Sequence, residues 1–258
     1  MDSRSKDRVR QQYSRQAHLY AKSRPHAWGD TLELMARWAA CQGTESVLDV
    51  ACGCGFSAFA LAPVAAKVTA IDITPRMLEE ASRLAEQRGL SNIEFQEADA
   101  EALPFPDGHF HLVSCRISAH HFSSPPAFLS ESWRVLIPGG ALLLADTSSP
   151  EELELSHWHN ETERLRDPSH VQNFTPSQWR EMVLRAGFQI AEFSSEYRSH
   201  LEFSDWVRTS GCSPETISML LQRFEQAPPE VKRAFQIQRR GDQIAFSWPI
   251  TALKAIKP

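Results

Sequence analysis

Asp49-Val-Ala-Cys-Gly-Cys-Gly55 is the stretch that decides the fold, because it follows the apolar pair Val47-Leu48 and precedes a helix-like segment, Phe56 to Ala62. A strand that turns on glycines into a helix brings bare backbone N–H groups and the positive end of the helix up to a ligand. A second expected strand, Val68-Thr-Ala-Ile-Asp72, ends on a carboxylate. Together these two strand ends predict a binding site for a cofactor.

Composition and charge narrow the class of protein. The chain has 258 residues and a net charge of −5, and its Lys and Arg residues are scattered among acidic ones, which argues against a nucleic-acid partner. Its five cysteines include no Cys-x-x-Cys pair, so we expect reduced thiols and a cytoplasmic location. The amino terminus is polar, and no run reaches the ~18 apolar residues of a membrane span, so we expect a soluble, unprocessed protein.

Short apolar runs alternate with amphipathic stretches along the chain, which is typical of a parallel sheet with helices on both faces. Helices are expected over Pro75–Gly89, after the cap-like Thr74, over Pro126–Leu136, which Pro138-Gly-Gly140 should end, and from Thr175 to Gly187. The seven expected strands are Ser46–Val50, Lys67–Ile73, Ile93–Ala98, Phe110–Cys115, Ala141–Ala145, Phe188–Ser194 and Gln243–Ile256.

We expect a single domain with two helical covers over one rim of the sheet. Residues 1–44 form the first cover, 45–200 the cofactor-binding core, 201–240 a helical lid insert and 241–258 the final strand. Large apolar residues recur at helical spacing in the lid segment, where Pro228-Pro229 interrupts them.

Six motifs carry a resemblance to a known family. Four of them follow one another along the chain: Val47-Leu-Asp-Val-Ala-Cys-Gly-Cys-Gly55, Ala70-Ile-Asp-Ile-Thr74, Glu97-Ala-Asp-Ala-Glu-Ala-Leu-Pro-Phe105 and Arg134-Val-Leu-Ile-Pro-Gly-Gly140. The other two are Ser114-Cys-Arg-Ile-Ser-Ala-His-His-Phe122 and Arg166-Asp-Pro-Ser-His-Val171.

With these motifs the chain resembles a class I S-adenosylmethionine-dependent methyltransferase of the small-molecule branch related to the quinone C-methyltransferases (methyltransferase type 11). The resemblance implies a doubly wound, Rossmann-like, seven-stranded α/β sheet with an antiparallel last strand, S-adenosylmethionine as cofactor and a small organic acceptor. Quinone enzymes have an Arg-Asn-containing sequence where this chain has Ala119-His-His-Phe122, so the acceptor stays open.

The glycine turn and the second strand supply the first set of predicted cofactor residues. A carboxylate at the end of the second strand can accept hydrogen bonds from two ribose hydroxyls, and we assign this role to Asp72. Gly53 and Gly55, with Ala51 in the same loop, let the backbone pass close to the methionine portion. Asp49 is expected to orient the loop and the ammonium group, or else only to fasten the loop.

The following strands supply the second set. The resemblance implies that Asp99 accepts from the adenine amino group while the backbone N–H of Ala100 donates to the ring. It also places Cys115 and Arg116 beside the methionine portion. Three side chains have a packing role as an alternative: Ile73 and Met77 are expected to sandwich the purine, and Tyr20 to lie over the carboxylate of the cofactor or over the acceptor.

Methyl transfer is an in-line displacement at the methyl carbon, and the sulfonium is already a good leaving group, so few residues must be catalytic. A base is needed only when the acceptor retains a proton at neutral pH. We expect His120 and His121, beyond the fourth strand, to act as base or to orient the acceptor, and His170 is the other candidate. No metal site is expected, because His157 and His159 are two residues apart and point in different directions on a helix.

Two alternative functions remain open. Gly53-Cys-Gly55-Phe-Ser-Ala58 also fits the relaxed dinucleotide pattern of a nicotinamide-dependent oxidoreductase. The lack of an unambiguous catalytic acid or base leaves room for a regulatory module that binds the cofactor without turnover. Sheets of this kind often dimerise through their rims, so a homodimer is also open.

Overall fold

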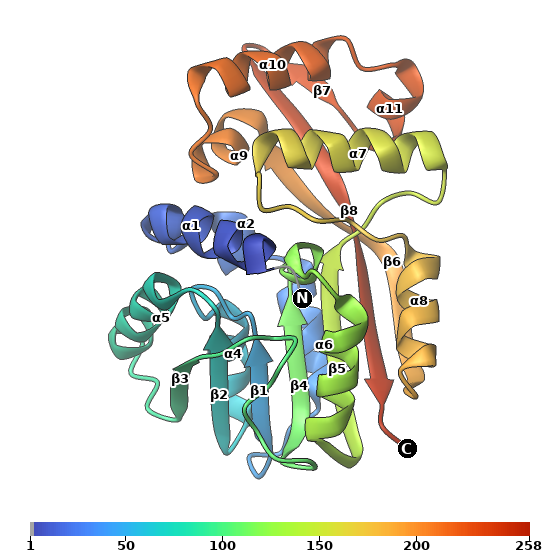
Figure 1. The fold of residues 1–258 in the computed structure, drawn as a ribbon. Coiled ribbons are helices and arrows are strands. Elements are labelled where there is room, and N and C mark those ends of the chain that lie inside the picture. Colours follow the sequence, from blue (N-terminus) through green and yellow to red (C-terminus); the bar gives the residue numbers. More distant parts are fainter. Residues whose placement is uncertain (1–2) are drawn as a thin grey trace.

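The computed structural model describes residues 3–258, and its centre is one mixed β-sheet (Figure 1). The strand order is β3-β2-β1-β4-β5-β8-β6, and β7 pairs with β8. The first five strands of this path are parallel, whereas β8 runs antiparallel to both β5 and β6. The strands are β1 (Ser46–Val50), β2 (Lys67–Asp72), β3 (Ile93–Glu97), β4 (Phe110–Arg116), β5 (Leu136–Thr147), β6 (Gln189–Glu202), β7 (Gln238–Arg240) and β8 (Gln243–Ile256).

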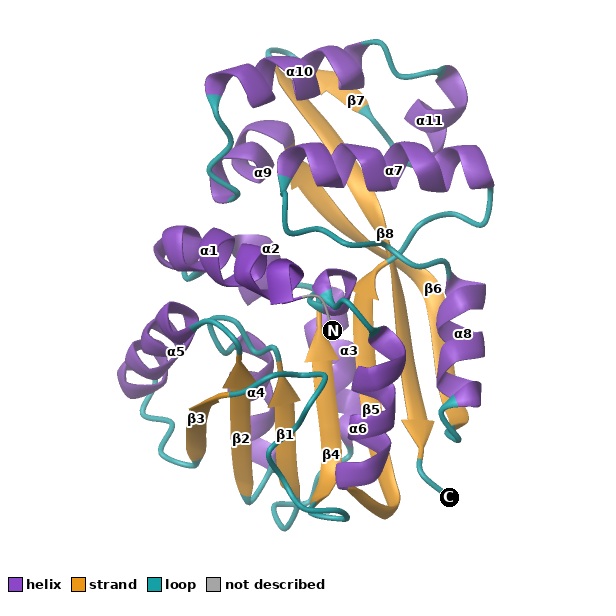
Figure 2. Ribbon diagram, viewed as in Figure 1, coloured by secondary structure: helices purple, strands orange, loops and turns teal. Residues whose placement is uncertain are grey.

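Helices cover both faces of the sheet, which confirms the predicted doubly wound α/β fold (Figure 2). Helices α6 (Pro125–Val135) and α8 (Pro176–Arg185) pack on one face, where Phe128 and Trp179 are fully buried. Helices α3 (Asp30–Ala39) and α4 (Phe56–Leu61) pack on the other face. Because both faces are covered, the central strands are buried along nearly their whole length.

Two groups of helices lie beyond the carboxyl ends of the parallel strands (Figure 1). Helix α1 (Ser3–Tyr20) and the short α2 (Arg24–Ala27) lie across these ends, and α1 contacts α5 (Pro75–Gln87). Farther out, helices α7 (Leu153–Arg166), α9 (Phe203–Thr209), α10 (Pro214–Glu225) and α11 (Pro229–Ala234) pack around the long outer ends of β6 and β8. We call α7, α9, α10 and α11 the lid layer.

Several local expectations need correction. The sheet has an eighth strand, the short β7, which forms a hairpin with β8 around Gly241. Pro138-Gly-Gly140 does not simply stop α6, because it lies inside β5, which begins at Leu136. Thr74 precedes α5, but its hydroxyl makes no capping hydrogen bond. Its backbone N–H donates to the Asp72 carboxylate. Helix α3 packs on the sheet face through Leu34 rather than over the rim.

No helix within residues 3–258 is long and apolar enough to cross a membrane.

The carboxyl ends of the parallel strands form the edge of the sheet at which a ligand is expected. In open α/β sheets, ligands bind outside the carboxyl ends of the strands, at the point where the strand order reverses. Here that point lies between β1 and β4, directly beneath α1.

Candidate functional site

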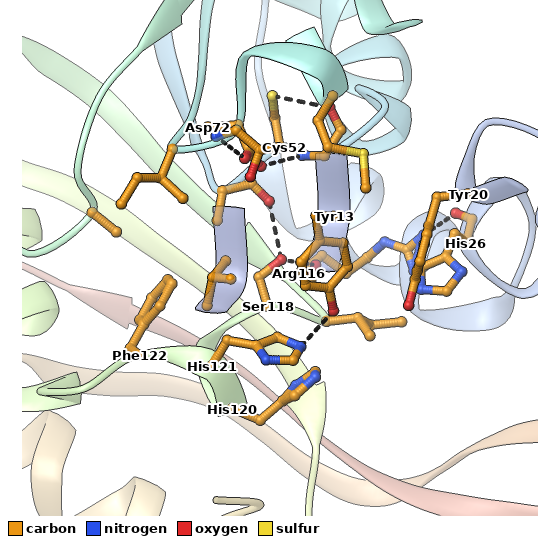
Figure 3. Close-up of a pocket in the computed structure, with 18 of the residues that line it drawn as sticks. Tyr13, Tyr20, His26, Cys52, Asp72, Arg116, Ser118, His120, His121 and Phe122 are labelled. Carbon is orange, nitrogen blue, oxygen red and sulfur yellow. Dashed lines mark hydrogen bonds between the residues drawn. The ribbon is translucent and has the colours of Figure 1, made fainter. Parts of the chain in front are cut away.

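A cavity of about 180 Å³ lies at this edge of the sheet, enclosed by the strand ends, α1 and the lid layer. Figure 3 shows Asp72 and Cys52 at one end, His120 and His121 at the other, and Arg116 between them. Most of the predicted site residues line this cavity: Tyr20, Ala51, Gly53, Asp72, Ile73, Met77, Asp99, Ala100, Arg116, His120 and His121. Four predicted residues do not line it: Asp49, Gly55, Cys115 and His170.

The glycine loop leaves open space where a ligand would lie. A Cβ atom added at Gly53, whose φ is +53°, would meet nothing within 4 Å. Gly55 is different, because a Cβ there would lie 2.7 Å from the ring of Phe59. Gly53 therefore faces the cavity, whereas Gly55 is required for the packing of α4. Ala51 also has a positive φ, of 52°, which costs a residue with a side chain about 1 kcal/mol or more.

Asp72 fastens two backbone segments at the end of β2. Its Oδ2 accepts the Gly53 N–H at 2.9 Å, and its Oδ1 accepts the Thr74 N–H at 2.8 Å. Burial raises the pKa of this carboxyl, and the two backbone donors oppose that rise. Asp72 thus holds the glycine loop in place, and each oxygen retains a lone pair for a ligand hydroxyl.

Asp49 lies beneath the loop and is 1% exposed. Its Oδ1 accepts the Ser114 hydroxyl at 2.7 Å, but its Oδ2 makes no hydrogen bond of normal geometry. Burial raises the pKa of Asp49 to about 7, with smaller opposing effects from Ser114 and the Ala58 backbone. Asp49 thus contacts β4 and does not line the cavity, and its predicted roles toward the loop and the ammonium group stay predictions.

The β3 end of the cavity is closed by a residue of α1. Lys6 Nζ lies 2.5 Å from Asp99 Oδ2 and 2.9 Å from Glu101 Oε2. The other oxygen of Asp99 accepts the Glu101 N–H at 2.9 Å. No pattern in the sequence indicated this contact, since Lys6 and Asp99 are 93 residues apart. Each oxygen of Asp99 therefore already contacts one donor and retains a second lone pair.

At the end of β4 the chain presents a buried cation. Arg116 is 9% exposed, and its Nη2 donates to the His26 carbonyl. Its Nη1 has no hydrogen-bond partner, and burial lowers the pKa of the guanidinium to about 10. The next residue, Ile117, has a φ of +51°, a strained conformation for a β-branched residue. Ser118 then donates to the Ala51 carbonyl at 3.0 Å, which joins this turn to the glycine loop.

His120 is held from behind by a carboxylate that the sequence reasoning missed. Asp146 Oδ1 lies 2.7 Å from His120 Nδ1, and Asp146 Oδ2 accepts the His120 backbone N–H at 2.7 Å. Asp146 is fully buried at the end of β5. It follows an apolar strand just as Asp72 does, so the same signal in the sequence would have identified it.

His121 is fully engaged by other residues. Its Nδ1 lies 3.1 Å from the Ser169 carbonyl oxygen, which can only accept, so Nδ1 carries the proton. Its Nε2 therefore accepts the Tyr13 hydroxyl at 2.6 Å (Figure 3). Burial, together with the neighbouring His120, lowers the pKa of His121 to about 4. His121 thus binds α1 to the core.

His170 belongs to a buried polar network behind the cavity. Its Nε2 lies 3.0 Å from the Asn160 Oδ1, and its Nδ1 is buried without a partner. The ring centroid lies 5.6 Å from that of His120. A direct role for His170 in catalysis does not fit this position, because the side chain does not reach the cavity.

The lid layer contributes aromatic walls and an ion pair. Trp206 and Trp248 line the cavity, and the Arg166 guanidinium lies over the Trp206 ring at 5.1 Å. Glu163 accepts from Arg166 at 2.8 and 2.9 Å, so the charges of these two side chains offset each other. Sequence spacing identified Trp206 as lid core, and Trp248 belongs to the expected final strand, but neither pattern indicated that these rings reach the strand ends.

Comparison with known proteins identifies a matching family and several similar proteins. The sequence profile of the family described as "Methyltransferase domain" matches residues 48–144. The uncharacterized methyltransferase YcgJ of Bacillus subtilis is 32% identical over 248 residues, which cover 95% of this chain and 97% of that protein. A crystal structure of a candidate methyltransferase from Bacillus halodurans is 38% identical, with a TM-score of 0.83, and covers 89% of this chain and 99% of that one. The demethylmenaquinone methyltransferase of Thermus thermophilus is 43% identical over 108 residues, only 41% of this chain and 49% of that protein.

Proposed function

This chain belongs to the S-adenosylmethionine-dependent methyltransferases, and from that membership we propose that its cavity binds S-adenosylmethionine and a small organic acceptor side by side. The nicotinamide-dependent oxidoreductase and the regulatory module receive no support from the relatives, which are described as methyltransferases. The near full-length likeness includes the lid layer, whereas the likeness to the quinone enzyme covers less than half of the chain. The partial likeness therefore does not indicate a quinone as the methyl acceptor of this chain.

The observation that carries the proposal is the pattern of unused groups in the cavity. Arg116 Nη1 is a buried donor without a partner, which suits the carboxylate of an amino acid. The open space at Gly53 suits the chain that joins this amino acid to the nucleoside. Asp72 retains lone pairs for two ribose hydroxyls. These three groups lie in the order that the methionine portion, the sulfur and the ribose of S-adenosylmethionine require.

The proposed adenine end of the cavity is contacted by a residue of α1. We propose that Ala100 N–H and the Asp99 carboxylate bind the adenine edge, with Ile73 and Met77 against the ring. All four line the cavity. Lys6 pairs with both Asp99 and Glu101, so it offsets part of the negative charge beside the carboxylate that would accept from the neutral adenine amino group. Lys6 thus supports adenine recognition from α1.

Bound S-adenosylmethionine supplies an electrophilic methyl group on a positively charged sulfur. The chain positions the acceptor behind that methyl group and excludes water from the site, which is the main contribution that such a displacement requires. Tyr13, His120, Trp206 and Trp248 enclose the remaining half of the cavity, which we call the acceptor half.

The proposal is tested by calorimetry with S-adenosylhomocysteine and with NADH. We expect S-adenosylhomocysteine to bind and to raise the unfolding temperature, and NADH to do neither. Incubation with S-adenosylmethionine labelled on the methyl group and with a size-fractionated cell extract should label only the low-mass fraction. Absence of S-adenosylhomocysteine binding, or label confined to macromolecules, would contradict the proposal.

A further inference from the structure

The acceptor half contains one histidine with a free lone pair. The carboxylate of Asp146 accepts from the His120 backbone N–H and from the Thr147 N–H at 2.9 Å, so it acts as an acceptor on both oxygens. The ring Nδ1 of His120 must then carry the proton that Asp146 Oδ1 accepts. Nε2 consequently holds the lone pair, and no residue within 3–258 makes a hydrogen bond to it. His120 lines the cavity, so this lone pair is available to a ligand.

Neither His121 nor His170 offers a free lone pair to the cavity. The Nε2 lone pair of His121 is occupied by the Tyr13 hydroxyl. The ring of His170 donates to Asn160, and it does not line the cavity. Of the three histidines predicted from the sequence, only His120 can receive a proton from a bound molecule.

The charges around His120 favour a protonated ring once a proton arrives. Burial alone lowers the pKa of His120, but the charge and hydrogen bond of Asp146 outweigh burial and raise it above 6.5. Glu163 also raises this pKa, and Arg166 opposes it. The charged and titratable groups that act on His120 are Asp146 from β5, Glu163, Arg166 and His159 from α7, His26 from α2, His121 from its own turn, and His170 from the loop after α7.

We propose that Asp146 is a positioning residue that holds His120 as the proton acceptor of the reaction, and that the methyl acceptor is a neutral molecule with a weakly acidic, aromatic or enolic hydroxyl group. The proposal rests on the proposed function. Ammonium-bearing acceptors fit poorly, because Glu163 is already paired with Arg166. The indole rings of Trp206 and Trp248 instead offer apolar walls to a flat molecule.

The step balances without any further reactant. His120 Nε2 takes the hydroxyl proton, and a lone pair of the acceptor oxygen forms the new bond to the methyl carbon. The carbon–sulfur bond breaks, and its electron pair stays on sulfur. The products are the methyl ether and S-adenosylhomocysteine, and His120 then releases its proton to solvent. Asp146 remains an acceptor throughout and stabilises the charged ring.

Nuclear magnetic resonance of the ring nitrogens tests the positioning role in the full-length protein saturated with S-adenosylhomocysteine. We expect the neutral His120 ring to carry its proton on Nδ1, and Asp146→Asn to move the titration midpoint down by about one pH unit or more. The control Thr147→Val removes the weaker 3.3 Å contact to Nδ1 and the 2.6 Å hydrogen bond to Asn173 Oδ1, but it removes no charge, so its shift should be much smaller. A wild-type ring with its proton on Nε2 would overturn the proposal, even if Asp146→Asn does not fold. An unchanged midpoint in a folded Asp146→Asn variant would do the same.

Binding of 4-nitrophenol and of 4-nitroanisole to the same complex tests the acceptor class. The two probes have similar shapes, but only the phenol carries a proton for His120. We expect tighter binding of the phenol by about tenfold, with the visible absorbance of the phenolate developing at a lower pH than in free solution, and loss of both effects in His120→Asn. Equal affinities, no binding of the phenol, or preferential binding of 4-nitrobenzylamine would overturn the proposed class. Because S-adenosylhomocysteine binding is measured first, its failure marks the failure of the proposed function instead.

Discussion

Replacement of Asp49 by Asn should stabilise the ligand-free protein in a pH-dependent way. The pKa of Asp49 is about 7 in the folded protein, against an ordinary value of 3.8. At about 1.4 kcal/mol per pKa unit, this raised pKa lowers the stability of the fold by about 4 kcal/mol at pH 8 and by about 2 kcal/mol at pH 5, relative to a pH well below 3.8. The sign follows from the raised folded pKa: the stability is fully present below the unfolded pKa and is lost as pH rises towards 7.

The Asn side chain removes this charge but places an amide N–H where Oδ2 has no partner, at a cost of about 1–3 kcal/mol. That cost does not depend on pH. The free energy of unfolding of Asp49→Asn relative to wild type should therefore rise by about 2–3 kcal/mol between pH 5 and pH 8. Urea denaturation at the two pH values measures this difference, and Asp242→Asn, the same change at an exposed hairpin residue, should show almost none. A difference below about 0.5 kcal/mol would refute the assignment of a buried, pH-dependent cost to Asp49.

The remaining predictions concern the donor end and α1. Replacement of Asp72 by Ala should weaken S-adenosylhomocysteine binding by on the order of 2–3 kcal/mol in calorimetry, since charge-assisted hydrogen bonds are lost; unaltered affinity removes Asp72 from the site. Tyr13→Phe takes away the donor that favours the neutral ring of His121, so its pKa should rise above about 4 in a nuclear magnetic resonance titration; an unchanged value contradicts the assigned hydrogen bond. Lys6→Met breaks two ion pairs of α1, so hydrogen exchange in residues 3–20 should accelerate roughly fivefold or more, for a loss of about 1 kcal/mol. The exposed control Lys22→Met should leave that exchange rate unchanged, and equal acceleration in both variants would speak against a specific role of Lys6.

The sequence was sufficient where a function depends on the backbone near the end of a strand. Asp72 and Gly53 could be placed at the cavity because a buried parallel strand, a turn and a helix leave little freedom in where their ends lie. The loop conformation was only partly predictable, since Ala51 and Ile117 adopt positive φ values that glycine would have signalled. Residues with side chains usually avoid this region, so the sequence carried no mark of it.

The sequence was insufficient where two distant segments meet. His120 was a candidate from its place after the fourth strand, but its partner Asp146 is 26 residues away on the neighbouring strand. His120 and His121 are adjacent in the chain, and yet one faces the cavity with a free nitrogen and the other binds Tyr13 of α1. Local pattern does not distinguish two such neighbours, because the difference arises from which elements pack around them.

Helix α1 has a consequence for the order of events during turnover. It contacts the adenine end of the cavity through Lys6, the acceptor half through Tyr13 and the lid layer through Gln12, which donates to the Ser210 carbonyl at 2.8 Å. One helix thus spans both proposed ligand sites, so any displacement that frees one spent ligand also loosens the contacts to the other. Product dissociation should then be a single concerted event, and its rate should follow the mobility of residues 3–20 more closely than the rate of bond formation.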